Sequence, residues 1–426
     1  MTSAPMNRRK FVALSGLSVT AAALSGCGLL GNKSGGAGDE KAINFYHWRA
    51  EDKQVFDQLI KQFKAANAGY DVTMTILPSQ NYQSTALQKI KDGTAGDVFT
   101  AFRGAQFEQI AKAGVFTDLS GATFVSNYQP HVIEPGAKDG KQLGLPYQLV
   151  FNMPVYNVEL FDKAGVGDLP EDWKGFLSLC EKLKGLGVAP IAFPGGDAAN
   201  AGQLFNCMVM NEMPEADSCR KIEMGKAKVT DDWFLRVLTR YEDLATMGAF
   251  QEGSAGTKTE QAIQMWAQAK AAMLATGTFH IGAARQQGAA FKVNLIGPIT
   301  TDAGKATYEG VHNSTFILGV NAKSAKQEAA RKWVEFLSGK PAAEAYANGT
   351  VQHLTVKDLT YTNADLAATA GWATRKTLLA PRFQFDDLDI RNAVENACTQ
   401  VATGTAKPAQ AAEEAQKIIS QRLGTS

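Results

Sequence analysis

The chain has 426 residues, of which 45% are apolar and 20% are charged, and its formal net charge is +1. This length and apolar content are enough for a large buried core and for two domains. No dense run of Lys or Arg follows the N-terminal segment, so the charge pattern argues against a nucleic acid partner.

The first 27 residues have the pattern of an export signal. A basic stretch, Arg8-Arg9-Lys10, precedes an apolar run over residues 12–24, which is too short to cross a bilayer permanently. The run ends in Leu-Ser-Gly-Cys, which resembles the lipobox of bacterial lipoproteins and implies cleavage before Cys27 and lipidation of its thiol. The paired arginines also resemble a twin-arginine signal, so export by the Sec or the Tat route stays open.

Residues 28–41 are rich in Gly, Ser, Asn and Lys and are typical of a flexible tether between a membrane anchor and a domain. Outside the cytoplasm, the other four cysteines are free to form disulfides. Cys207 and Cys219 are close in sequence and are the pair we predict. Cys180 and Cys398 fit burial as small apolar residues at least as well.

From residue 42 onward, the pattern alternates between strand and helix. Apolar residues alternate over 43–46 and 72–76, and they recur at helical spacing over 55–63, which predicts a βαβ unit. A helix over 82–91 and a buried strand over 97–101 follow. Ligands of open α/β sheets bind at the carboxyl ends of strands, so we expect a site at the turns 48–51 and 102–104.

Several later segments resemble, in order, those of the carbohydrate-binding, maltose-binding-protein-like receptors of ABC importers. They are the extended stretch 145–157, the strand and turn 272–279, the strands 293–298 and 315–321, and the helices 326–337 and 408–415. The resemblance implies the α/β, two-lobed periplasmic-binding-protein type II fold, each lobe a mixed sheet flanked by helices, with the ligand between the lobes. We predict lobe 1 over 42–148 plus 303–352, and lobe 2 over 149–302 plus 353–426.

A sugar site combines aromatic rings, which stack on C–H faces, with polar groups that bind hydroxyls. Trp48 is the first candidate for stacking, and Arg49 and Glu51 are candidates for the polar rim. Alternatively, Trp48 covers the core while Arg49 and Glu51 form a surface ion pair. Arg103, after a buried strand, is a further candidate.

The remaining candidate ligand residues lie beside predicted strand ends or the crossing between lobes. Phe279 stands where the family commonly has Trp, which weakens a stacking role there, and each of these residues also fits a structural role. The candidates are Tyr147, Asn152, Phe279, His280, His312, Asn313 and Trp372.

The motifs of zinc proteases, α/β-hydrolases and P-loop ATPases are absent, and the five histidines have no metal-ligand spacing. We therefore expect no enzymatic activity, no metal and no cofactor. The resemblance implies a monomer that delivers a sugar to permease subunits, with the ATPase on a separate chain. Two alternatives stay open: a receptor of the same fold for a non-sugar solute, and a lipid-anchored glycosidase that uses a carboxylate pair such as Asp386 and Asp389.

Overall fold

The structure is a computed structural model that describes residues 40–78 and 82–425. The predicted signal peptide, the lipidation site Cys27 and most of the predicted tether lie outside these residues. In the described part of the chain, no helix is both long and apolar enough to cross a membrane.

The predicted βαβ start is confirmed. Strand β1 (Ala42–His47) leads through helix α1 (Lys53–Ala66) to β2 (Asp71–Ile76), and β1 and β2 pair in parallel. Helix α1 buries one apolar stripe against the sheet, as its helical spacing predicts: Phe56, Leu59, Ile60 and Phe63.

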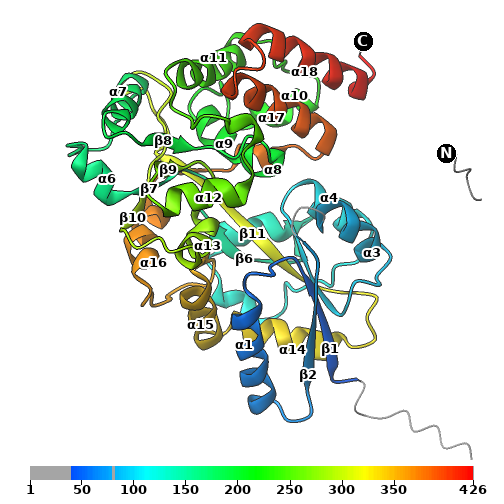
Figure 1. The fold of residues 1–426 in the computed structure, drawn as a ribbon. Helices are drawn as coiled ribbons and strands as arrows, with labels where there is room; N and C mark the ends of the chain where they lie inside the picture. The colour runs from blue at the N-terminus through cyan, green and yellow to red at the C-terminus, as the bar shows by residue number, and fades with distance from the viewer. Residues whose placement is uncertain (1–39, 79–81, 426) are drawn as a thin grey trace, which may run out of the picture. The chain divides into compact units, whose positions relative to one another are not determined.

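A seven-stranded mixed sheet forms the centre of what we call the first lobe (Figure 1). Its order is β12-β6-β11-β3-β1-β2, and β13 pairs with β11. The long strand β11 runs antiparallel to both β3 and β6. The remaining strands are β3 (Val98–Ala101), β6 (Leu145–Val150), β11 (Gly310–Val320), β12 (His353–Leu354) and β13 (Thr377–Leu379), and the hairpin β4 (Ala137–Lys138) and β5 (Lys141–Gln142) stands apart. The helices of this lobe are α1, α3 (Leu87–Lys91), α4 (Ala105–Lys112), α5 (Pro130–Ile133), α14 (Gln327–Ser338) and α15 (Lys340–Thr350).

A four-stranded sheet with the order β10-β7-β9-β8 forms the centre of the second lobe. Its strands are β7 (Val155–Asn157), β8 (Ala189–Ala192), β9 (Ala271–Leu274) and β10 (Val293–Leu295). Its helices are α6 (Val158–Lys163), α7 (Trp173–Lys184), α8 (Ala198–Ala201), α9 (Gln203–Val209), α10 (Ser218–Glu223), α11 (Asp232–Thr246), α12 (Thr259–Ala267), α13 (Ile281–Gln286), α16 (Ala364–Thr369), α17 (Leu388–Ala402) and α18 (Pro408–Leu423).

Single helical turns complete the secondary structure. They are the π-helical η1 (Tyr82–Ala86) and the 3-10 turns η2 (Thr123–Asn127), η3 (Glu134–Gly136), η4 (Ser254–Gly256), η5 (Thr278–His280), η6 (Ala370–Thr374) and η7 (Pro381–Gln384).

Short segments join the two sheets. Strand β6 of the first sheet continues through residues 151–154 into β7 of the second, and residues 296–309 lead back from β10 to β11. The predicted lobe bounds stay a prediction. Strand pairing adds that His353 and Leu354 join the seven-stranded sheet through β6.

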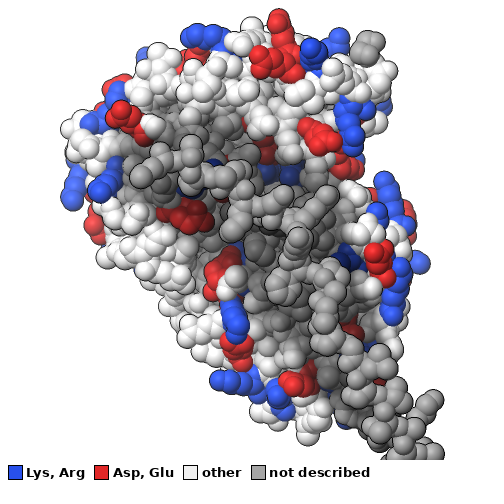
Figure 2. All heavy atoms as spheres, turned by 45° about the vertical axis from the view of Figure 1, so that its right-hand side comes forward, with Lys and Arg blue, Asp and Glu red and all other residues white. Residues whose placement is uncertain are grey.

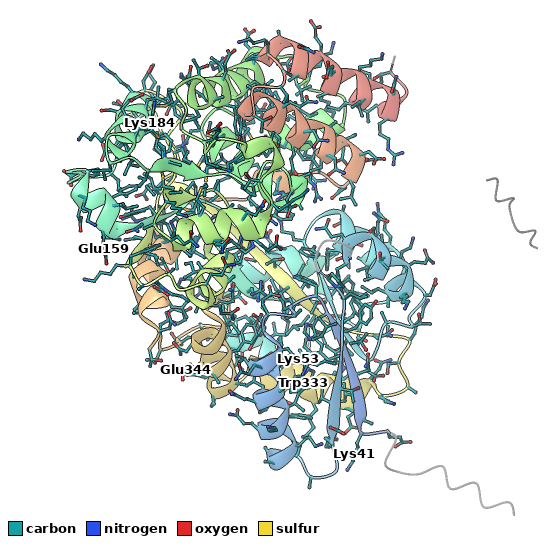
Figure 3. The ribbon with its side chains drawn as sticks, in the orientation of Figure 1. Lys41, Lys53, Glu159, Lys184, Trp333 and Glu344 are labelled. Atoms are coloured by element: carbon teal, nitrogen blue, oxygen red, sulfur yellow. The ribbon has the colours of Figure 1, made fainter. Side chains whose placement is uncertain are left out.

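The apolar interior consists of two clusters, one within the second lobe and one that fills the first lobe and continues into the second. In the first lobe, Trp333 is fully buried, with ring centroids 5.1 Å from Phe63 and 5.6 Å from Phe336. Figure 3 labels Trp333 there, and it labels Glu159 and Lys184 on exposed outer helices of the second lobe. On the described part of the face in Figure 2, basic and acidic side chains are interspersed, as expected from the near-zero net charge.

The predicted disulfide is wrong. Cys207 and Cys219 are both buried and free. The thiol of Cys207, on α9, points at the backbone oxygen of Asn152, whereas the thiol of Cys219, on α10, lies 3.7 Å from the sulfur of Met213. The two cysteines are close in sequence, but their helices turn the thiols toward different neighbours. Cys180 and Cys398 are also free and buried, as in the alternative interpretation.

Candidate functional site

Two aromatic rings meet where neighbouring parallel strands end. Trp48 follows β1 and Phe102 follows β3, and because β1 and β3 pair in parallel, their carboxyl ends lie side by side. The rings stack with centroids 3.9 Å apart and an interplanar angle of 15°. Trp48 is only 5% exposed, whereas Phe102 is half-buried.

This stack changes the interpretation of Trp48. Its ring is covered by Phe102 on one face and also contacts Tyr82 and Phe316, so it does not present the open face that we predicted for stacking on a ligand. Phe102 presents the accessible ring instead. The sequence carried a signal for Phe102, because it is the first residue of the turn 102–104 at which we expected a site.

Arg49 forms ion pairs with two carboxylates of its own lobe. Its Nε and Nη2 donate to the two oxygens of Asp52, at 2.7 and 3.1 Å, and its Nη1 lies 3.1 Å from Glu51. Asp52 also accepts a hydrogen bond from the hydroxyl of the buried Tyr346. Arg49 and Asp52 are both buried, whereas the Glu51 side chain is 47% exposed. The structure therefore matches the ion-pair alternative for Arg49, and Glu51 keeps an accessible carboxylate.

Arg103 lies beside Phe102 and reaches toward the segment that leads from β13 to α17. Its Nη1 donates to the Asn313 side chain at 3.3 Å and to the Ala380 backbone oxygen at 3.5 Å. Its guanidinium lies 5.8 Å from the centre of the Phe383 ring. Burial is the main cause that lowers the pKa of Arg103 to about 10, so it stays charged at neutral pH. The predicted residues Arg103 and Asn313 are thus in contact.

The turn with Phe279 and His280 packs beside the crossing from β6 to β7. The Phe151 backbone N–H donates to the Thr278 hydroxyl, and the Thr278 N–H donates to the Phe151 oxygen. Phe279 is half-buried and its ring lies 4.4 Å from that of His280. Asn152, in the same crossing, donates to Gln203 at 2.8 Å, and its side-chain oxygen is buried with no partner among the described residues.

The pKa of His280, in the second lobe, is affected by a charge of the first lobe. Burial, and then the charge of Arg49, lowers the pKa of His280 to about 3. Its Nδ1 lies 2.8 Å from the Thr276 hydroxyl. Arg49, which follows β1, and His280, which belongs to η5, are therefore close enough for the charge of Arg49 to disfavour protonation of His280.

Two predicted residues, Tyr147 and His312, make contacts within the first lobe. The Tyr147 side chain is fully buried and donates to the Leu337 oxygen at 3.0 Å, so it is a packing residue and not part of a cleft floor. His312 joins β11 to β13, with its Nδ1 2.9 Å from the Thr377 hydroxyl. Tyr147 therefore stays away from the Phe102 turn, whereas the His312 backbone oxygen accepts from Ala380, whose own oxygen accepts from Arg103 of that turn.

Trp372 lines a hollow whose lining residues do not include Phe102 or Arg103. Its indole N–H donates to Asn294 at 3.2 Å, and the guanidinium of Arg375 covers its ring at 4.4 Å. The hollow has a volume of about 890 Å³ and is formed mainly by residues 167–171, 296–299 and 304–309 together with Trp372 and Arg375. Trp372 is 5% exposed, so it contributes a wall and not an open ring face.

Sequence reasoning missed a group of polar residues at the start of α17. Arg382 is buried and makes two hydrogen bonds to Glu395, at 2.9 and 2.8 Å. Arg391 shares the same carboxylate at 3.8 Å and also donates to Gln83 of the first lobe at 3.2 Å. These residues lie far from the predicted turns in sequence, and only the fold brings them near the carboxyl ends of β1 and β3.

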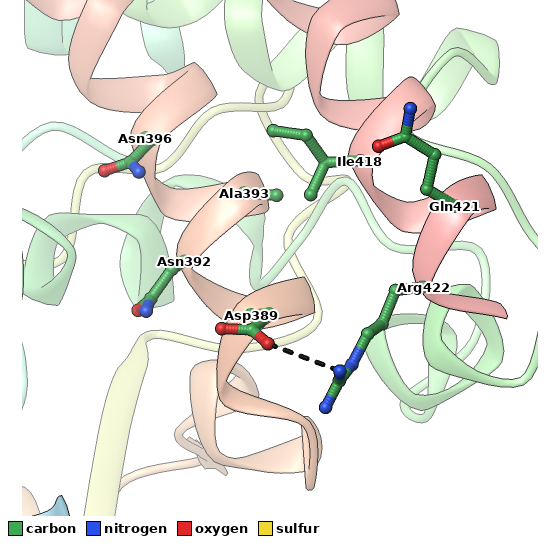
Figure 4. Close-up of a pocket in the computed structure, with 7 residues that line it drawn as sticks. All are labelled: Asp389, Asn392, Ala393, Asn396, Ile418, Gln421 and Arg422. Carbon is green, nitrogen blue, oxygen red and sulfur yellow. Dashed lines mark ion pairs between the residues drawn. The ribbon is translucent and has the colours of Figure 1, made fainter.

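No metal centre emerges from the described residues, which contain no group of three or more His, Cys, Asp or Glu side chains suited to a metal ion. The carboxylate pair considered for a glycosidase is divided between two ion pairs. Asp386 lies 3.3 Å from Arg220, and Asp389 lies 3.6 Å from Arg422 (Figure 4). Both carboxylates are therefore bound to arginines.

The fold is that of two-lobed solute-binding proteins. A solved structure described as "SBP RafE in complex with raffinose" matches with a TM-score of 0.77 at 17% identity, covering 89% of this chain and 99% of that one. This likeness confirms the predicted fold class.

The chain belongs to the bacterial extracellular solute-binding protein family, whose model matches residues 48–344. A "multiple sugar-binding protein" of Streptococcus mutans is 23% identical over 316 residues, which cover 72% of this chain and 73% of the relative. The "sn-glycerol-3-phosphate-binding periplasmic protein UgpB" of Rhizobium meliloti is 23% identical over 299 residues, which cover 63% of this chain and 66% of the relative.

Proposed function

We propose that this chain is the receptor of an ABC sugar importer, which captures a mono- or oligosaccharide between its lobes and delivers it to the permease. The observation that carries the proposal is the half-buried ring of Phe102, held against Trp48 and followed directly by Arg103. An aromatic face beside hydrogen-bond donors suits the alternating C–H and hydroxyl surfaces of a sugar. The names of the Streptococcus mutans relative and of the raffinose complex support the same class of ligand.

Capture requires no chemistry on the ligand. A sugar that contacts groups of both lobes stabilises the closed arrangement by the difference between its affinities for the closed and open forms. The closed form then docks on the permease, and a separate chain hydrolyses ATP. Phe102 and Glu51 on the first lobe, with Phe279 and the Asn152 side chain on the second, are the groups that we assign to the ligand.

The N-terminal segment supports attachment to the outer face of the cell membrane. Cleavage before Cys27 and lipidation of its thiol would hold the receptor near the permease, with residues 28–41 as the tether. Replacement of Cys27 by Ser should release the exported protein from the membrane fraction. Retention of that variant in membranes would contradict the anchor.

The melting temperature of residues 42–426 tests the proposal against a panel of mono- and oligosaccharides. A ligand that binds only the folded state at 100 times its Kd stabilises it by about 2.7 kcal/mol. A clear rise with one sugar, which is then recovered unchanged after long incubation, is the expected result. Consumption of the sugar would indicate a glycosidase instead.

A receptor for a non-sugar solute is the second candidate, because the Rhizobium meliloti relative is named for glycerol 3-phosphate. A melting-temperature rise with such a solute, and with no sugar in the panel, would favour it.

A further inference from the structure

Arg103 differs from Arg49, Arg285 and Arg382 in its lack of a carboxylate partner. Arg49, Arg285 and Arg382 each form two hydrogen bonds to one carboxylate, in the fork geometry that guanidinium groups prefer. Over residues 40–78 and 82–425, no carboxylate oxygen lies within 4.0 Å of Arg103.

The neutral contacts of Arg103 use only part of its donor capacity. One nitrogen, Nη1, makes both of its hydrogen bonds, at the long distances of 3.3 and 3.5 Å. Guanidinium has five N–H donors, so the edge formed by Nε and Nη2 stays available. The side chain is half-buried, which means that part of it is accessible to a ligand beside the Phe102 ring.

The surrounding charges do not neutralise Arg103. The carboxylate of Asp386 attracts it, but that carboxylate lies 3.3 Å from Arg220, whose own charge repels Arg103. At the start of α17, Arg382 and Arg391 share the carboxylate of Glu395, while Asp387 and Asp389 share Arg422, so the charges there balance and leave Arg103 as the cation without a carboxylate partner.

A chain of hydrogen bonds connects Arg391 to the Phe102 turn. Arg391 donates to the Gln83 side chain, whose backbone oxygen accepts from Gln106, and Gln106 in turn accepts from the backbone N–H of Phe102. The positive charge of Arg103 itself directly follows the aromatic ring on which the proposed function depends. Carrying a half-buried cation without an anion is costly, and a ligand that supplies the anion recovers that cost.

The geometry points to a solute that carries an anionic group, a carboxylate or a phosphate, which pairs with Arg103 while its carbon skeleton packs on Phe102. The inference rests on the proposed function and narrows it from sugars in general to acidic sugars or sugar-like phosphate esters. A uronic acid and a phosphate ester offer the same chemistry to a guanidinium, and the experiment separates them.

Calorimetric titration of residues 42–426 with matched acidic and neutral compounds tests this inference. The pairs are glucuronate with glucose, galacturonate oligomers with galactose oligomers, and glycerol 3-phosphate with glycerol. We expect one acidic member to bind at least about tenfold more tightly than its neutral counterpart, as one half-buried charged pair provides. Its affinity should also fall as salt is raised.

Substitutions assign the preference to Arg103. Arg103→Gln should remove the acidic preference, so that the acidic and neutral members of a pair bind with similar Kd, and Arg103→Lys should keep part of the preference because it keeps the charge without the fork. Arg331→Gln is the matched control, since Arg331 is also half-buried but lies on α14 and donates to the Asp118 backbone oxygen. Melting temperatures of all variants verify that each is folded.

The outcomes separate this inference from the proposed function. If neutral sugars bind as tightly as acidic ones, or if Arg103→Gln keeps the preference, the inference is overturned and the sugar receptor stands. Binding of glycerol 3-phosphate without any sugar supports the anionic preference and overturns the sugar assignment. Binding of none of the compounds overturns both.

Discussion

Replacing Phe102 is the sharpest test of how the proposed site binds a sugar. A half-buried Phe leaves on the order of 50 Å² of its ~200 Å² surface for a ligand to cover. Covering that area contributes about 1.2 kcal/mol at 25 cal/mol per Å². The directional contact of an aromatic face contributes about 1 kcal/mol more. Phe102→Leu, which keeps most of the apolar area but removes the flat ring, should therefore weaken sugar binding by roughly 1 kcal/mol, about fivefold in Kd.

The matched control is Tyr70→Leu. Tyr70 is also a half-buried aromatic residue of the first lobe, but it packs against Phe63, far along α1 from the Phe102 turn. We expect this variant to bind sugar like the wild type. The assay is calorimetric titration with the sugar that raises the melting temperature, and the melting temperature of each variant reports folding. Equal Kd values for Phe102→Leu and the wild type would refute the stacking role.

Three further predictions concern stability and the thiols. Glu395→Gln leaves the buried Arg382 without a charged partner and should lower the free energy of unfolding, measured by urea denaturation, by about 3 to 5 kcal/mol. Glu242→Gln, in an exposed pair with Lys407, should lower it by under about 1 kcal/mol, and similar losses for both variants would contradict the first prediction. Burial lowers the pKa of His47 to about 3 and that of His353 to about 4, below the 6.5 of the unfolded chain. The unfolded state therefore binds more protons below pH 6.5, and stability should fall as pH drops, by up to about 2 kcal/mol per histidine at pH 5. Equal urea midpoints at pH 7 and pH 5 would refute this, and His353→Gln should reduce the fall. Finally, all four cysteines of residues 42–426 should react with a thiol reagent only after unfolding, because they are buried and free and burial raises their thiol pKa values. Rapid labelling of the native protein, or fewer than four reactive thiols after unfolding without reductant, would contradict this prediction.

The sequence predicted the fold well wherever one local pattern decides the structure. Alternation over 72–76 and helical spacing over 55–63 are direct consequences of burying one face, so the βαβ start could be predicted. The two-residue strand β12 and the three-residue strand β13 carry no such pattern. They exist because β6 and β11 offer edges for pairing, which is a property of the assembled sheet.

The site was predictable as a location but not residue by residue. The turns after β1 and β3 were expected to meet, and they do, because parallel neighbours end at the same edge. Which ring of the Trp48 and Phe102 stack lies inside depends on the packing of Tyr82 and Phe316 against Trp48. The pairing of Arg382 with Glu395, like the separate surroundings of Cys207 and Cys219, depends on tertiary contacts that spacing does not encode.

Calorimetric titration of wild-type residues 42–426 with a sugar panel tests the central claim most directly. The account predicts saturable binding of one sugar per chain, with a negative heat-capacity change from burial of the ligand, and recovery of the sugar chemically unchanged. Saturable binding only of a compound that is not a carbohydrate, or conversion of the bound sugar into a product, would contradict it.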